Sequence, residues 1–314
     1  MSTDNPKIDN QESSRVYALF YSFFLIPLMI VIFGVLFYLL FSVITEEPTD
    51  INQLLIKLET GSMRDKSNAS YNLNKLFFEN QNKYDTLYRH RIIKIHEMTQ
   101  SKYFSDETLR LHTIMIMGNS GDQEFGDILI KELSSDNLEF RIKAIESLGK
   151  LRYHASSREI IKFLDKDKTF LEKLAATGSL GNIGNKTAIN SLIGLIESWP
   201  QNWIDTDGPE LRWEASIALL KLDYVDDKTK NIINNLLDRN YLATVKSYNE
   251  TNQEYNELNQ NTIDFVIMKI LTIINSIEDL NLIIDFNNNI YNLSESDSNL
   301  EIRDFSKKLY KRFK

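Results

Sequence analysis

The sequence predicts an all-α protein in which a single transmembrane helix precedes an α-solenoid. Two observations predict it: a long run without charged residues near the N-terminus, and a block that recurs four times in the body of the chain. The composition agrees, because 11 glycines and 5 prolines in 314 residues are few for a protein built on β-turns. We therefore expect a polar tail over residues 1–15, the transmembrane helix over 16–44 and the solenoid over 45–314.

The expected transmembrane helix carries no charged side chain between residues 16 and 44. Spanning the hydrocarbon core takes about 20 apolar residues, and tilting or a kink at Pro27 would take up the excess length. A cleaved signal peptide is the alternative. Its apolar region would be only about 7–15 residues long and small residues would follow it, whereas the sequence continues SVITEEP. We expect an uncleaved, single-pass anchor.

The orientation of the anchor follows from the basic residues that flank it. Lys7 and Arg15 precede the apolar run, and no basic residue follows it before Lys57. Basic residues close to a span favour the cytoplasmic side. The sequence therefore predicts a cytoplasmic N-terminus and a solenoid on the periplasmic or other extracytoplasmic side.

The body of the chain contains four related blocks, at residues 109–122, 140–153, 171–184 and 211–224. Each carries a basic residue near its start and a large apolar residue seven positions later, and three of them have a glycine at the eighth position. The basic residues are Arg110, Arg141, Lys173 and Arg212; the apolar residues are Met117, Leu148, Leu180 and Leu219; the eighth positions are Gly118, Gly149, Gly181 and Leu220. We expect each block to be an amphipathic helix that ends near its glycine, where a left-handed residue costs little.

An acidic residue precedes each block, and its carboxylate can cap a helix N-terminus. A second helix is expected after each turn, because apolar residues recur four positions apart. The expected caps are Asp106, Asp136, Asp167 and Asp207; the expected second helices are 125–133, 157–164, 188–198 and 229–239. Two helices per unit of about 31–39 residues are typical of an α-solenoid.

This pattern resembles HEAT repeats, in particular the short HEAT-like type of the phycobilisome lyases. The resemblance covers residues 105–240 and extends more loosely over 51–76, where Lys66 and Leu73 keep the spacing, over 261–286 and over 298–313, a polar and basic C-terminal cap. It implies a protein-binding surface without a preorganised catalytic cleft. An enzyme or tetrapyrrole-handling protein similar to the phycobilin lyases is the alternative.

The glycine-rich stretch GSLGNIGNKT, residues 178–187, is interpreted as a turn between helices. A phosphate-binding loop needs G-x-x-x-x-G-K-[ST] after a strand, but Asn185 separates Gly184 from Lys186 and Ser179 occupies the first glycine position. The glycines Gly178, Gly181 and Gly184 also miss the dinucleotide pattern. Gly184 aligns with Gly121 of the first block, in the turn between paired helices, and Lys186 opens the second helix.

Other chemistry finds little support in the sequence. The histidines His90, His96, His112 and His154 lack the spacing of metal ligands on one helix face, there is no cysteine, and no nucleophile elbow occurs. A net charge of −8 lacks the electrostatic pattern of a nucleic-acid-binding protein. We expect no enzyme activity, no cofactor, no metal and no nucleic acid.

Three features are candidates for partner binding. The residues 197–210 form an insertion that lengthens one repeat, and it carries Trp199, Trp203, Asp205 and Asp207; insertions in solenoids are often on the binding face, although the tryptophans could instead pack on the helices. The basic residues Arg110, Arg141, Lys173 and Arg212 would form a ladder that bonds neighbouring repeats or recognises an acidic partner. Tyr241, Tyr248 and Tyr255 are expected on one side of a helix.

The sequence thus predicts a membrane-anchored scaffold or accessory subunit of a membrane complex. Partner proteins, other subunits among them, would dock on the concave helices of the solenoid. A spacer without a specific partner remains a third interpretation.

Overall fold

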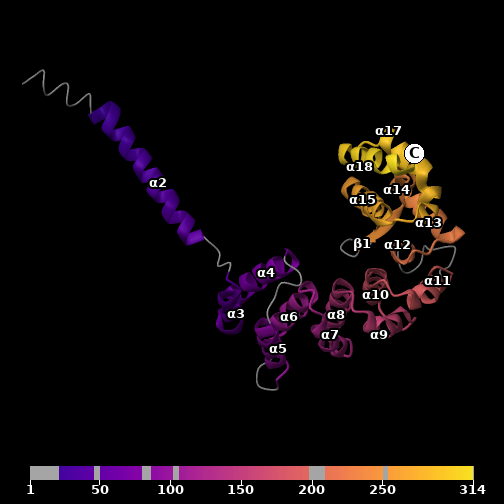
Figure 1. Cartoon of the computed structure of the whole chain (residues 1–314), viewed down its shortest axis with the longest axis horizontal. Coiled ribbons are helices and arrows are strands. Elements are labelled where there is room, and N and C mark those ends of the chain that lie inside the picture. The colour runs from indigo at the N-terminus through magenta and orange to yellow at the C-terminus, as the bar shows by residue number, and fades with distance from the viewer. Residues whose placement is uncertain are drawn as a thin grey trace, which may run out of the picture. The chain divides into compact units, whose positions relative to one another are not determined.

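The computed structural model describes residues 21–45, 50–79, 86–101, 106–197, 209–249 and 254–313. The chain divides into two compact units, Met1–Gln53 and Leu54–Lys314. The described part of the first unit is mainly one apolar helix, and the second unit is a stack of helical pairs (Figure 1). The predicted fold class, an α-solenoid that follows an apolar helix, is confirmed.

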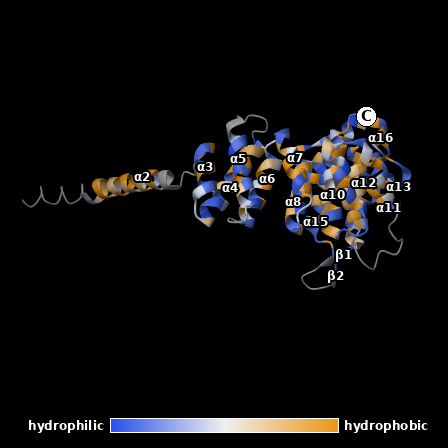
Figure 2. Cartoon of the chain, turned by 90° about the horizontal axis from the view of Figure 1, so that it is seen from below, coloured by the Kyte–Doolittle hydropathy of each residue, from blue (hydrophilic) through white to orange (hydrophobic). Residues whose placement is uncertain are grey.

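The apolar helix of the first unit begins as a π-helical turn, η1 (Tyr21–Leu25), and continues as α2 (Ile26–Thr45). Proline lacks an N–H group for the α-helical ladder, and Pro27 lies where the π turn gives way to the α-helix. The segment Phe23–Leu40 has a mean hydropathy of 2.8 and none of it is buried (Figure 2). It is long and apolar enough to cross a membrane; residues 1–20 lie outside the described part.

The second unit stacks first helices on first helices, and each second helix packs against the row that they form (Figure 1). The stack begins with α3 (Ile51–Thr60). The first helices are α4 (Met63–Glu79), α6 (Glu107–Asn119), α8 (Leu138–Leu151), α10 (Phe170–Ile183) and α12 (Glu210–Lys221). The second helices are α5 (Thr86–Thr99), α7 (Gly126–Glu132), α9 (Ser157–Ile161), α11 (Ile189–Glu197) and α13 (Asp227–Leu236), and the short 3-10 turns beside three of them are η2 (Gln123–Phe125), η3 (His154–Ser156), η4 (Lys162–Leu164) and η5 (Lys186–Ala188).

Each of the first three repeat helices ends one or two residues after its glycine, as expected, but the expected role of the glycine as the helix-ending residue is wrong. Gly118, Gly149 and Gly181 lie inside α6, α8 and α10. A Cβ atom on Gly149 would lie 2.7 Å from the Cβ of Ser179 in the next repeat. These glycines are therefore needed because the backbones of successive first helices approach closely, and not because a turn requires them.

The left-handed turn residue stands eleven positions after each basic residue of the ladder. It is Gly121 (φ 73°), Arg152 (φ 53°), Gly184 (φ 77°) and Asp223 (φ 55°) in the four repeats. The expected alignment of Gly184 with Gly121 is thus confirmed, and Lys186 does open the turn before α11. Glycine adopts this conformation freely, whereas other residues pay about 1–2 kcal/mol for it.

Of the four N-terminal caps that the sequence predicted for the first helices, one is confirmed. Asp106 caps α6, because its carboxylate accepts a hydrogen bond from the Leu109 N–H. The expectation for the next two repeats is wrong: Asn137 rather than Asp136 caps α8, and Thr169 rather than Asp167 caps α10. The fourth expected cap, at residue 207, lies outside the described residues.

The C-terminal part departs from the repeat. A two-stranded hairpin, β1 (Lys246–Asn249) and β2 (Glu254–Glu257), occupies the segment that was expected to be a tyrosine-striped helix. Tyr248 and Tyr255 are opposite one another in the strand register, so their spacing of seven reflects pairing across a hairpin. The helical elements of this part are α14 (Arg239–Thr244), α15 (Gln260–Ser276), α16 (Leu280–Ile283), η6 (Ile284–Phe286), α17 (Asn287–Ser296), α18 (Leu300–Tyr310) and η7 (Lys311–Phe313).

Helix α15 is packed among α12, α13, α14 and α18, as its apolar sequence predicts. Arg239 joins these elements: its guanidinium donates to Asp264 at 2.6 Å and to Asp297 at 2.8 Å. At the other end of α15, Arg312 donates to the main-chain carbonyls of Asn275 and Ile277. The C-terminal helices thus close the stack through ionic and cap contacts.

Candidate functional site

The predicted binding insertion cannot be placed. Trp199, Trp203, Asp205 and Asp207 lie outside the described residues, between α11 and α12. Its role in binding therefore stays a prediction. The ladder residues, in contrast, are all described.

Arg110 is a structural member of the ladder. Its guanidinium donates to both carboxylate oxygens of Glu132 on α7, at 2.9–3.1 Å. His96 on α5 lies 3.2 Å from the same carboxylate, and its other ring nitrogen lies 2.8 Å from the hydroxyl of Thr113. Burial raises the pKa of Glu132, but contacts with His96 and Arg110 outweigh this effect and hold the pKa below its usual value. The cluster joins two adjacent repeats in their interior.

Arg141 is also structural. It donates to Glu172 on the next first helix at 2.7 Å and to the main-chain carbonyl of Ser135 at 2.8 Å. Glu172 is itself the reciprocal partner of the Thr169 cap of α10. Two of the four ladder residues therefore bond neighbouring helices. This is the structural role that was considered for the ladder, and not the recognition of an acidic partner.

The other two ladder residues are held less firmly. Lys173 reaches the main-chain carbonyl of Lys166 at 3.4 Å, and the Nε atom of Arg212 is buried without a hydrogen-bond partner among the described residues. Lys66 on α4 occupies the corresponding position in the preceding repeat and forms an ion pair of 3.1 Å with Asp106. The ladder is thus mainly internal to the stack, and it is not a continuous basic surface.

A groove of about 360 Å³ crosses the open face of three first helices, α8, α10 and α12. Leu171 is one of its lining residues, and 50% of its surface is exposed. Gly178 lines it beside Glu214, which accepts a hydrogen bond from Lys269 at 2.6 Å. The full lining is Ile142, Glu146, Lys150, Leu171, Leu174, Ala175, Gly178, Ser179, Asn182 and Glu214. The groove is therefore amphipathic, with apolar side chains between charged ones.

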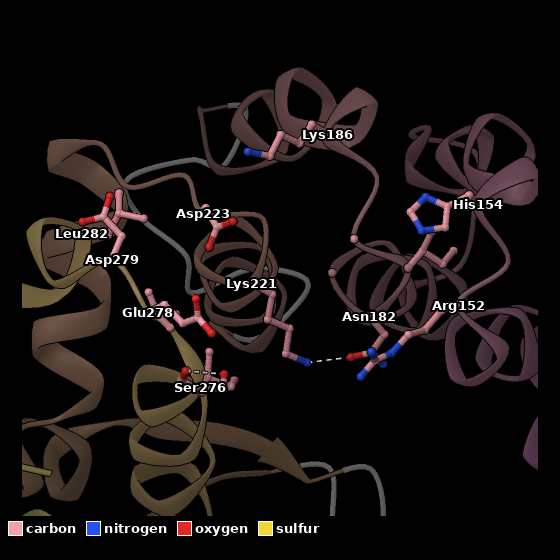
Figure 3. A pocket seen from close by; sticks show the side chains of 15 residues that line it. Arg152, His154, Asn182, Lys186, Lys221, Asp223, Ser276, Glu278, Asp279 and Leu282 are labelled. Carbon is pink, nitrogen blue, oxygen red and sulfur yellow. Dashed lines mark hydrogen bonds between the residues drawn. The ribbon is translucent and has the colours of Figure 1, made fainter. Parts of the chain in front are cut away.

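A larger cleft, of about 1000 Å³, lies where the C-terminal ends of successive first helices meet α15 and α16. Residues Gly181 to Gly184 of the glycine-rich stretch form part of its wall, so this turn borders a cleft. Figure 3 shows Arg152 and His154 on one side of the Lys221–Asn182 hydrogen bond and Glu278 and Asp279 on the other. The cleft thus has a basic side and an acidic side.

Lys221 lies between these two sides. Its ammonium donates to the amide oxygen of Asn182 at 2.7 Å. Burial lowers the pKa of Lys221, Glu214 opposes this shift, and the neighbouring charges of Lys269 and Arg152 lower the pKa further. Lys221 is therefore a partly buried ammonium group with Arg152 and Lys269 as neighbouring cations and Glu214 as a neighbouring anion.

The sequence did not indicate this cleft, because its charged residues come from three repeats and from the segment between α15 and α16, which are far apart in the chain. One signal was available. The left-handed turn position carries glycine in two repeats but Arg152 and Asp223 in the other two, and both of these residues line the cleft. In the described residues, no group of three or more metal-ligating side chains gathers.

Comparison with known proteins gives structural similarity only. No protein-family model matches the sequence, and no curated protein matches it. The complex of CpcE and CpcF of phycocyanin lyase from Nostoc sp. PCC7120 is 14% identical with a TM-score of 0.49, over 86% of this chain and 97% of that one.

Two further solved structures are similar at comparable levels. The archaeal HEAT-like repeats protein from Thermococcus onnurineus NA1 is 15% identical with a TM-score of 0.40, over 85% of this chain and 98% of that one. A designed armadillo repeat protein is 13% identical with a TM-score of 0.37, over 84% of this chain and 100% of that one. The α-solenoid assignment rests on the stacked helical pairs of this chain itself.

Proposed function

We propose that the chain is a membrane-anchored scaffold, or an accessory subunit of a membrane-associated complex, that binds protein partners and catalyses no reaction. The observation that carries the proposal is the amphipathic groove on the first helices. Several apolar side chains that line one hollow between polar groups, here Ile142, Leu171 and Leu174, are typical of an interaction surface. A helix or loop of a partner would lay its apolar side chains between Leu171 and Leu174.

The anchor is the second part of the proposal. Eighteen residues from Phe23 to Leu40 are apolar and unburied, and a lipid environment would satisfy such a helix. The N-terminus would be cytoplasmic and the solenoid extracytoplasmic. Anchoring would raise the concentration of the groove near membrane partners without any additional contact.

The anchor is tested against the signal-peptide alternative by the mass of the mature protein and by washing membranes at alkaline pH. The proposal expects a full-length chain that stays with the membrane; a shortened chain in the wash would contradict it. A reporter fused after Lys314 tests the topology, and activity of a reporter that works only in the cytosol would overturn the outward orientation.

The groove is tested by purifying the tagged full chain in mild detergent. We expect Leu171→Glu to release the co-purifying proteins that wild type retains. Leu300→Glu is the matched control, because Leu300 on α18 is exposed (69%) and lies outside the groove. Equal recovery from both variants would argue against docking in the groove.

The insertion is tested in the same preparation with Trp199→Ala and Trp203→Ala combined. If the insertion contributes to docking, partner recovery falls while the helical content stays unchanged. Unchanged recovery would restrict docking to the helices. A visible absorbance band in the purified wild type would instead point to a bound pigment and contradict a purely protein-binding role.

A further inference from the structure

The larger cleft described above, called the turn cleft from here on, is lined by residues from Arg152 to Leu282. Two of its charged residues occupy backbone positions that glycine adopts without strain. Arg152 and Asp223 have φ angles of 53° and 55° and occupy the turn position that glycine fills at Gly121 and Gly184. A non-glycine residue stays in the left-handed region only where the surrounding structure holds it there, and such residues are frequent at ligand sites. Arg152 thus opposes the local backbone preference, whereas aspartate at position 223 is among the few residue types that adopt this conformation beside glycine.

The fold does not use these two side chains. Within the described residues, Arg152 and Asp223 form no side-chain hydrogen bond or ion pair, although both line the cleft. The same holds for Lys186 and Glu278. A structural role through bonding therefore does not account for the charged residues at the strained positions.

The charges are separated rather than mixed. Arg152 lies at the end of α8, and the half-buried Lys221 lies between Arg152 and the acidic residues (Figure 3). Among the described residues, Lys221 donates only to a neutral amide oxygen. Glu278 and Asp279 precede α16, and Asp223, in the turn directly after α12, lies on the same side of Lys221 as these two residues (Figure 3). A polyanion such as a nucleic acid would meet repulsion from the acidic side, and a uniformly basic ligand would meet repulsion from the other.

We propose that the turn cleft binds a segment of a partner protein that carries one acidic and one basic side chain, the acidic one against Arg152 and Lys221 and the basic one against Asp223 and Glu278. The complementarity of charge on both sides selects a segment of both signs. This inference rests on the proposed partner-binding function, but it concerns a different surface from the first-helix groove.

The proposal is tested by site-specific photo-cross-linking with the full chain in membranes of the cells that encode it. p-Benzoylphenylalanine replaces Ser276, an exposed and uncharged residue of the cleft, or Ala175 in the groove. We expect the probe at 276 to cross-link a protein segment with both an acidic and a basic residue. Removing the two charges with Arg152→Asn and Asp223→Asn, which tolerate the left-handed backbone, should lower the yield at least about fivefold.

A second measurement separates binding from folding. Arg152→Gly with Asp223→Gly should lower the cross-linking yield equally while raising Tm by about 2–4 °C, because glycine relieves both turns. The matched control, Arg158→Ala with Asp304→Ala, removes the same two charges at exposed positions outside the cleft and should leave the yield unchanged.

The outcomes are distinct. An unchanged yield in the Asn and Gly variants, or a cross-link from 276 to lipid, to nucleic acid or to a segment with charge of one sign only, would overturn the proposal. Capture from 175 without capture from 276 would overturn it and leave the groove function standing. Absence of capture from both positions would remove the partner-binding function as well.

Discussion

The smallest features that decide this fold are the glycines eight positions after the ladder residues. At Gly149 a Cβ atom would lie 2.7 Å from the Cβ and 2.8 Å from the Cα of Ser179, closer than packed carbon atoms lie. The contact repeats between Gly118 and Ser147, and between Gly181 and Ala218. Small residues on both helices thus allow the first helices to stack at close range.

We predict that Gly149→Ala destabilises the protein by about 1–3 kcal/mol, because the new methyl group over-packs the α8–α10 contact. Gly194→Ala is the matched control. Gly194 lies inside α11 with open space around it, so alanine there should stabilise the helix by about 0.5–1 kcal/mol. Urea unfolding of the full chain in mild detergent, followed by its helical circular dichroism, measures both. A harmless Gly149→Ala would disprove the close-approach explanation.

The buried Glu132 predicts a pH dependence at the same scale. Its pKa in the folded protein lies below the ordinary value, so its stabilising contribution is present above the unfolded pKa of about 4.3 and is lost as the pH falls through the lower folded pKa. We expect Glu132→Gln to lose about 3 kcal/mol at neutral pH, because Arg110 and His96 keep no anionic partner.

The check for Glu132 is the urea midpoint as a function of pH. Wild type should lose stability on acidification below about pH 4.3 more steeply than Glu132→Gln. The control variant is Glu139→Gln on α8, where the side chain is exposed. Identical acid profiles for wild type and Glu132→Gln would show that the His96–Glu132–Arg110 cluster does not stabilise the fold.

At the scale of elements, the C-terminal helices depend on one cation. Arg239, at the start of α14, bonds Asp264 on α15 and Asp297 at the end of α17. Its partner Asp297 has a side chain only 1% exposed. Arg239 therefore joins three elements where the regular two-helix repeat has given way to a different packing.

We expect Arg239→Ala to destabilise the C-terminal helices by about 3 kcal/mol, since the Asp297 charge would stay buried without its partner. Limited proteolysis should then cut after α14 before it cuts among α6–α10, because solenoid repeats can open separately. Arg158→Ala, a loss of the same charge from an exposed site on α9, should leave the proteolytic pattern as in wild type.

At the scale of the whole molecule, the apolar helix and the solenoid are separate units with different solvent requirements. The segment from Phe23 to Leu40 is unburied and uncharged, whereas the solenoid buries its own apolar face between helix layers. The proposed membrane association should therefore depend on the apolar helix of the first unit alone.

We predict that Ile32→Arg with Leu36→Arg transfers the chain from the membrane to the soluble fraction, because each arginine at the centre of a span costs about 2.5–3.5 kcal/mol. Leu280→Arg, at an exposed position of the solenoid, should leave the chain in the membrane. Membrane flotation measures both, and retention of the double variant would contradict anchoring by α2.

The sequence by itself determined the features that repeat locally. Hydrophobic periodicity and the spacing of the ladder residues indicated the helical pairs, and an uninterrupted apolar run indicated α2, because each signal lies within one helix or one turn of the chain. The alignment of Gly184 with Gly121 followed from the same spacing, and both have the left-handed backbone.

Only the tertiary structure decided what neighbouring repeats do to one another. The structure shows that Gly118, Gly149 and Gly181 are contact points between first helices and do not serve as helix ends. It also shows a hairpin where a helix with a tyrosine stripe was expected. Tyrosines seven residues apart can lie on one face of a helix or, as Tyr248 and Tyr255 do here, opposite one another in two strands. The turn cleft also emerged only there. Its charges come from residues as far apart in the chain as Arg152 and Asp279, and stacking alone brings them to one surface.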